Sequence, residues 1–277
     1  MLEYPEVVTL AEQLAQTLPG KRVQQVFPPV KPHKFCWFSG DPASYDGALA
    51  GSAFTGAEGF GLYVELAFDN GCRLCFNDGV SPRLLPPGQQ AANYQLLIAF
   101  TDGWSLVFTV AMYGGLLLHN GELSNAYYLK SRQALSPTDA AFPSRYWAAL
   151  TASRPSLSLK AFLATEQRFP GIGNGVLQDI LWDAGLHPKR KLATLSHGDK
   201  EGLLKSIQQV LTAMAEAGGR DTERDLFGQK GGYATRLSKN ALACGCPRCG
   251  GALVKETYLG GTVYYCPQCQ HETPPDA

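Results

Sequence analysis

The sequence predicts an α+β protein with an N-terminal antiparallel β-sandwich and flanking helix, a helical domain, and a C-terminal four-cysteine zinc ribbon. Three observations predict this order. β-like runs alternate with Asn-Gly and Asp-Gly turns in the first half, helical periodicity follows a Pro-, Ser- and Ala-rich stretch, and two Cys-x2-Cys pairs close the chain. We therefore expect domains at residues 1–135, 136–240 and 241–277.

The first expected element is a helix from Pro5 to Leu18, whose apolar residues recur at helical spacing before a Pro-Gly-Lys break. Short β-like runs follow. Asn70-Gly71 and Asp102-Gly103 separate pairs of such runs and predict hairpin turns. We expect the alternation of strands and turns to continue through a further turn at Asn120-Gly121. These hairpins predict the antiparallel sandwich.

The composition shifts to Pro, Ser and Ala around 134–156, which predicts a linker. The runs LSLKAFLATEQ and GNGVLQDILWDAGLHP then read as two helices. A third helix is expected to begin after Ser196, with Asp199 completing a capping box, and to end at Gly218-Gly219.

The spacing of the last cysteines fits one tetrahedral, structural Zn²⁺ better than two disulfides. The expected ligands are Cys246, Cys249, Cys266 and Cys269. A further Cys-x2-Cys pair, Cys72 and Cys75, has no second pair to complete a site. We interpret these two thiols as core residues of a strand.

The chain of 277 residues has a formal net charge of zero, which is unusual for a strong non-specific nucleic-acid binder. The charge is uneven, because residues 1–150 carry 9 Lys and Arg against 12 Asp and Glu, whereas 151–277 carry 15 against 12. A bound polyanion is therefore expected on the C-terminal half. No apolar run suits a membrane span and the first residues do not resemble a signal peptide, so we expect a cytoplasmic protein.

The segment Gly171-Ile172-Gly173-Asn174 leads directly into a predicted helix. The free N–H groups and the positive dipole end of a helix favour an anionic oxygen, and the Asn174 amide can donate to a phosphate. A simple turn between two helices is the alternative interpretation.

This segment, together with Ala184-Gly185-Leu186-His187-Pro188, resembles the helix-two-turn-helix of the formamidopyrimidine-DNA glycosylase and endonuclease VIII family. The N-terminal helix, the sandwich and the terminal ribbon agree in order with that family. The resemblance implies base-excision repair, a monomer that binds double-stranded DNA, damaged or abasic, and a nucleoid location when bound. We expect DNA contacts from Gly173 and Asn174, and from the adjoining Lys189 and Arg190, which a solvated run of charges would explain equally well.

The family's chemistry, as the resemblance implies it, starts at an N-terminal amine that attacks the sugar C1′ and forms a Schiff base, assisted by a nearby Glu. Most members expose a proline after removal of the initiator Met, whereas this chain has Leu2. We expect Met1 to be retained, which displaces the amine by one residue. The candidate catalytic residues are therefore Met1, Leu2, Glu3 and Glu6, although Glu3 also has a plain interpretation as a charge at the helix N-terminus.

Other positions depart from the family pattern too. Phe60 stands where the family has a phosphate-binding Lys, and Gly261 stands where its ribbon has an Arg. Asn77 and Val80 occupy the loop whose Met enters the duplex in the family. Loss of these contacts predicts weaker DNA binding with a shallower salt dependence.

The leading hypothesis is a DNA-binding member of this family whose glycosylase and lyase chemistry is lost or strongly impaired. The alternative is an active glycosylase/lyase that uses the Met1 amine or a Glu-activated water on an unusual lesion. A third hypothesis is a scaffold that binds protein and no longer binds DNA.

Overall fold

A computed structural model describes residues 1–272, and the chain divides into two compact units. The first unit comprises Met1–Gln133 together with Glu223–Lys230, and the second comprises Ala134–Thr222 together with the chain from Gly231 onward. The three-domain division with boundaries after residues 135 and 240 stays a prediction.

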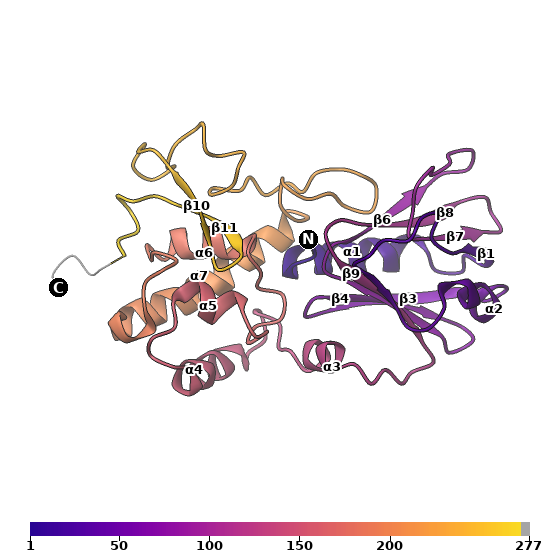
Figure 1. Ribbon diagram of the computed structural model, residues 1–277, viewed down its shortest axis with the longest axis horizontal. Helices are drawn as coiled ribbons and strands as arrows, with labels where there is room; N and C mark the ends of the chain where they lie inside the picture. The colour runs from indigo at the N-terminus through magenta and orange to yellow at the C-terminus, as the bar shows by residue number, and fades with distance from the viewer. Residues whose placement is uncertain (273–277) are drawn as a thin grey trace. The chain divides into compact units, whose positions relative to one another are not determined.

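The first unit contains the predicted β-sandwich (Figure 1). One sheet has the order β1-β7-β8-β6, from strands Val23–Phe27, Leu96–Phe100, Ser105–Val110 and Val80–Leu85. The other has the order β2-β9-β5-β4-β3, from Cys36–Phe38, Gly114–His119, Arg73–Asn77, Tyr63–Phe68 and Phe54–Phe60. Strand β2 pairs with β9 in parallel, and the other pairings are antiparallel.

The expected N-terminal helix is confirmed as α1, Tyr4–Thr17, with Pro5 in its first turn. A 3₁₀ turn at Pro42–Ser44 and the short helix α2, Tyr45–Leu49, follow β2. The sandwich core includes residues from α1 and both sheets, such as Leu14, Leu66 and Phe108. The segment Glu223–Lys230 adds Leu226, which is fully buried in this core and whose carbonyl accepts the N–H of Leu84 at 3.0 Å.

The outer face of the five-stranded sheet carries a second, smaller cluster. Because side chains alternate along a strand, Tyr63, Cys75 and Leu117 point away from the sandwich core. They pack against Tyr128 of helix α3, Ala126–Arg132. Helix α3 therefore covers part of this outer face.

Two sequence predictions are wrong. The β-like theme does not continue past Asn120-Gly121, because the Asn125 side chain accepts the N–H groups of Tyr127 and Tyr128 and starts α3 instead. The expected linker at 134–156 contains α4, Phe142–Ala152, in which Phe142 and Tyr146 are buried although 5 of the 11 residues are Ala, Ser or Thr.

The second unit consists of α4, α5 (Leu159–Ala164), α6 (Val176–Asp183), a 3₁₀ turn at Leu192–Thr194, α7 (His197–Glu216) and the ribbon strands β10 (Val254–Tyr258) and β11 (Gly261–Tyr265). The capping box of Ser196 and Asp199 at the start of α7 is confirmed. Among residues 1–272, no helix combines the length and the hydropathy that a membrane span needs.

Candidate functional site

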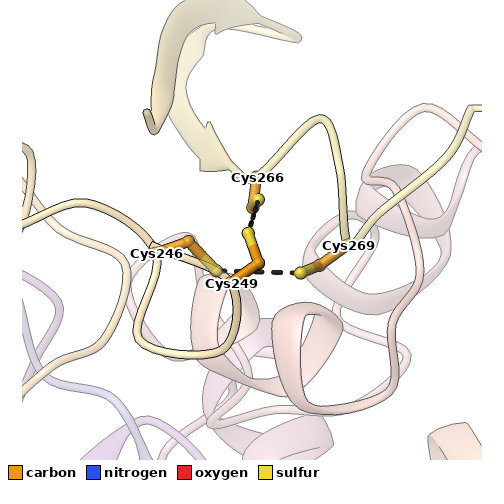
Figure 2. Close-up of side chains that lie close together, drawn as sticks. All are labelled: Cys246, Cys249, Cys266 and Cys269. Atoms are coloured by element: carbon orange, nitrogen blue, oxygen red, sulfur yellow. Dashed lines mark hydrogen bonds between the residues drawn. The ribbon is translucent and has the colours of Figure 1, made fainter. Parts of the chain in front are cut away.

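The four predicted metal ligands converge at the end of the ribbon (Figure 2). The Sγ atoms of Cys246 and Cys269 lie 3.8 Å apart, those of Cys249 and Cys266 lie 3.5 Å apart, and all four lie within 4.8 Å of one another. A tetrahedral zinc ion with bonds of about 2.3 Å holds its sulfurs about 3.8 Å apart, whereas a disulfide requires about 2.05 Å. The donor set therefore fits one zinc ion.

Neighbouring groups orient these cysteines. The indole N–H of Trp182 donates to Cys246 Sγ at 3.3 Å, and the backbone N–H of Gly251 donates to Cys249 Sγ at 3.4 Å. Trp182 packs with Cys246 and Cys266 in one buried cluster. Such hydrogen bonds stabilise the thiolate form that binds a metal. Bound zinc would fix the ribbon on α6, which carries Trp182.

Within the second unit, the turn of the ribbon hairpin packs against the predicted phosphate-binding corner, the segment Gly171–Asn174. The side-chain amide of Asn174 donates to the carbonyl of Thr262 at 2.8 Å, and Gln178 on α6 donates to the same carbonyl at 3.1 Å. Gln178 also accepts the N–H of Tyr264 at 3.0 Å. The Asn174 Oδ1 atom is buried with no hydrogen-bond partner. The corner and the ribbon therefore form a single polar site.

Lys160 completes this site, although the sequence analysis did not single it out. It is 3% exposed, and its ammonium donates to the carbonyls of Tyr258 and Gly261. Burial lowers the pKa of Lys160. A Cβ on Gly261 would lie 3.2 Å from both Lys160 Nζ and Asn174 Oδ1, so a larger residue there would require these side chains to shift. The sequence did hold a signal for this residue, because Lys160 falls on the core-facing side of helix α5, where a lysine is unusual.

The other expected DNA contacts are engaged within the second unit. Lys189 pairs with Glu256 on β10 at 2.9 Å, and this hydrogen bond raises the pKa of Lys189. Arg190 is 9% exposed and pairs with Asp199 at 2.8 Å, at the start of α7. Gly173 lies one residue before Asn174 and its carbonyl accepts the N–H of Leu177 at 3.3 Å. Their role in DNA binding stays a prediction.

The N-terminus is anchored within the first unit. The Met1 ammonium forms an ion pair with Glu223 at 2.9 Å, and the N–H of Leu2 donates to the carbonyl of Asp78 at 2.6 Å. The Leu2 side chain is buried. Glu223 could not be found from the sequence, because it reaches Met1 only through the returning segment Glu223–Lys230.

Glu3 and Glu6 are both buried at the start of α1. Glu3 occupies the N-cap position, and its carbonyl accepts the N–H of Val7 at 3.0 Å, but its side chain forms no capping hydrogen bond. Two carboxylates at this end of α1 match the sign of the helix dipole. Their burial therefore agrees with the structural interpretation of Glu3, and a catalytic role stays a prediction.

A second cluster of metal-ligating residue types lies on the outer face of the five-stranded sheet. The ligand atoms of Glu65, Cys75 and His119 lie within 4.8 Å of one another. Arg73 and Arg132 already pair with Glu65 at 3.1 and 3.5 Å, and burial raises the pKa of the Cys75 thiol well above its usual range. A metal cation at this cluster would be repelled by the two arginines that already pair with Glu65. We therefore interpret the cluster as an ion-pair network that stabilises the fold.

The known proteins that match nearly the whole of this chain are DNA glycosylases. The chain is 29% identical to the formamidopyrimidine-DNA glycosylases of Methylococcus capsulatus and of Alkalilimnicola ehrlichii, and each match covers 98% of this chain and 100% of the relative. The chain is therefore similar to formamidopyrimidine-DNA glycosylases over nearly its whole length. No model of a protein family matches the sequence.

Solved structures of the Lactococcus lactis enzyme share the fold of this chain. A complex of the Lactococcus lactis enzyme with DNA containing an abasic site matches with a TM-score of 0.81 at 20% identity, over 97% of this chain and 99% of that one. A Lactococcus lactis variant in complex with DNA containing a Fapy-dG lesion matches with a TM-score of 0.82. The fold of the Lactococcus lactis enzyme is thus present over nearly the full length of this chain.

Proposed function

We propose that this chain binds double-stranded DNA as a repair-family protein and that its glycosylase and lyase chemistry is lost or strongly impaired. The observation that carries the loss is the ion pair between the Met1 ammonium and Glu223. The Met1 nitrogen would have to leave Glu223 before it could attack a sugar carbon.

The geometry of Leu2 supports the same proposal. Its backbone N–H is an amide, because Met1 precedes it, and it donates to Asp78 at 2.6 Å. An amide nitrogen cannot form a Schiff base. The nearest amine is displaced by one residue, and a displacement of about 1 Å already costs a reaction about a hundredfold.

DNA binding is supported by the second unit. Asn174 and the buried Lys160 converge with the ribbon turn at Gly261, and zinc held by the four cysteines would fix that turn. The related Lactococcus lactis protein has been solved with DNA containing an abasic site, which makes this DNA the natural probe. Since the chain is neutral overall, we expect modest affinity.

The first experiment tests the chemistry. The purified chain is incubated with abasic-site duplex and borohydride, and a Schiff base between an amine and the C1′ aldehyde would be reduced to a stable covalent adduct. We expect little or no adduct, with the Methylococcus capsulatus glycosylase as the positive control. An adduct that matches this control and disappears when the N-terminus is blocked would contradict the proposal and establish the active alternative.

The second experiment tests DNA binding by fluorescence anisotropy at several salt concentrations. We expect binding to a duplex with an abasic-site analogue, and a loss of affinity of about tenfold in K160M and N174A. The matched controls K205M and N240A change exposed residues of the same unit and leave binding unchanged. Failure of the wild-type chain to bind at low salt would favour a protein-binding scaffold instead.

A further inference from the structure

The first unit contains a cavity of about 310 Å³ at one end of the outer face of its five-stranded sheet. Four aromatic side chains line it: Trp37 on β2, Tyr63 on β4, Tyr113 before β9, and Tyr127 on α3. Gly115 stands beside Trp37 in the pairing of β2 with β9, and its lack of a side chain keeps the cavity open. The size suits a small organic ligand.

The aromatic side chains form two pairs. The ring centroids of Trp37 and Tyr113 lie 6.3 Å apart with the rings tilted by 55°, and those of Tyr63 and Tyr127 lie 6.1 Å apart at 67°. Trp37 is 52% exposed and both Tyr113 and Tyr127 are 36% exposed. Large aromatic side chains exposed together around a cavity are typical of a binding surface.

Asp78 is the only charged side chain among the nine described residues that line the cavity. The Tyr127 hydroxyl donates to its Oδ1 atom at 3.2 Å. The two amide side chains of the lining have structural hydrogen bonds, since Asn77 accepts the N–H of Gly115 and Asn125 caps α3. The carboxylate of Asp78 is therefore the group that gives the cavity its electrostatic character.

The backbone holds Asp78 in a fixed position. Asp78 has φ of 53°, in the left-handed region, and Met112 in the neighbouring turn has φ of 66°. The two turns are joined by backbone hydrogen bonds, from Gly79 to the carbonyl of Tyr113 and from Ala111 to the carbonyl of Gly79, each 2.9 Å long. A Cβ on Gly79 would lie 1.9 Å from the Ala111 oxygen, so only glycine permits this contact. Left-handed residues held this firmly are common at functional sites.

We propose that this cavity binds a small organic cation whose positive charge is spread over a quaternary nitrogen or an alkylated aromatic ring. Aromatic faces attract such cations, and the Asp78 carboxylate adds a fixed negative charge. A metal ion would need several oxygen ligands, whereas this lining offers one carboxylate among rings. The cavity is separate from the polar site of Asn174 and Lys160, because every lining residue belongs to the first unit.

Calorimetric titration of the full chain tests this proposal with matched pairs of ligands. Choline is compared with 3,3-dimethylbutan-1-ol, which has the same shape without the charge, and 1-methyladenosine, a cation at neutral pH, is compared with adenosine. We expect at least one cation to bind about tenfold more tightly than its neutral counterpart. Choline binding would assign an aliphatic quaternary ammonium, and 1-methyladenosine binding would assign an alkylated base.

Three variants localise the binding. D78N keeps the size of the side chain and tolerates the left-handed backbone, and W37A removes one ring. Both are expected to weaken cation binding about tenfold. E122Q is the matched control, because it removes one exposed carboxylate of the same unit that does not line the cavity. Equal affinity for charged and neutral ligands, no binding of either cation, or unchanged binding in both D78N and W37A would overturn the proposal.

Discussion

Two carboxylates on one side of the sandwich have opposite surroundings. The Glu65 side chain is 1% exposed beneath α3, where it accepts hydrogen bonds from Tyr128 at 2.7 Å and His119 at 3.2 Å and pairs with Arg73 and Arg132. Burial alone would raise the pKa of Glu65, but these partners outweigh it and lower the pKa to about 2. Asp78 has one hydroxyl donor, Tyr127, and burial raises its pKa to about 6 although Tyr127 and the N-terminal charge oppose this.

Ionised Glu65 therefore stabilises the fold, whereas ionised Asp78 lowers the free energy of unfolding. The hydrogen-bond donors and arginines around Glu65 outweigh its burial and favour its charged form in the folded state, so its ionisation contributes to stability. The folded state disfavours the charged form of Asp78, so its ionisation reduces stability. A residue retained at such a cost is expected to serve binding, as the cavity at Asp78 indicates.

The largest expected effect follows from removing the charge of Glu65. E65Q leaves Arg73 and Arg132 beside a neutral amide, and we expect the free energy of unfolding at pH 7 to fall by about 3 kcal/mol in urea denaturation. E58Q is the control, because Glu58 pairs with Arg132 at the surface, and its loss is expected to cost less than about 1 kcal/mol. Equal effects of the two variants would show that the Glu65 network is not structural.

A pH series sharpens the same assignment. The pKa of Glu65 is depressed in the folded state, from an ordinary value of 4.5 to about 2, so its contribution is present above pH 4.5 and is lost as the pH falls toward 2. The wild-type chain should therefore lose its advantage over E65Q, about 3 kcal/mol, across this range. Urea midpoints of both proteins between pH 2 and pH 7 measure it. A constant difference would contradict the low pKa.

The sequence predicted these two regions to different extents. Period-2 patterning and Asn-Gly or Asp-Gly turns located the strands, and the cysteine spacing located the metal site, because both signals are local. The capping residue Asn125 was missed because one polar residue competes with a long β-like run, so α3 and its cover over Glu65 were missed as well. Helix α4 was missed because its composition resembles a linker.

The cavity could not be predicted from the sequence, because its residues come from distant elements. Trp37 meets Gly115 only through the parallel pairing of β2 with β9, and Tyr63 meets Asn77 only through the register of β4 with β5. Nothing in the local sequence around Asp78 indicates a cavity. In the same way, Lys160 and Glu223 acquire their partners only through long-range contacts.

A smaller effect, of opposite sign, is expected for D78N. Because the folded pKa of Asp78, about 6, exceeds its unfolded value of about 3.9, the wild-type chain loses stability as the pH rises from 4 to 6. D78N removes this loss, so its free energy of unfolding should match wild type at pH 4 and exceed it at pH 8 by about 1 to 2 kcal/mol, allowing for partial exposure. The Tyr127 hydroxyl and the Met1 ammonium face Asp78 in both proteins. A variant less stable than wild type at pH 8 would show that the Asp78 charge stabilises the fold.

The smallest effect on stability is expected for W37A, the variant that should also weaken binding of the cation in the cavity. Trp37 is 52% exposed at the edge of its sheet, so W37A should lower the free energy of unfolding by less than about 1 kcal/mol. Trp104 is partly buried against the sandwich core, and W104A should cost about 2 kcal/mol or more. Urea denaturation of both variants measures this contrast. If W37A were the more destabilising change, Trp37 would be a structural residue like those around Glu65. The exposed aromatic lining would then no longer support a binding site.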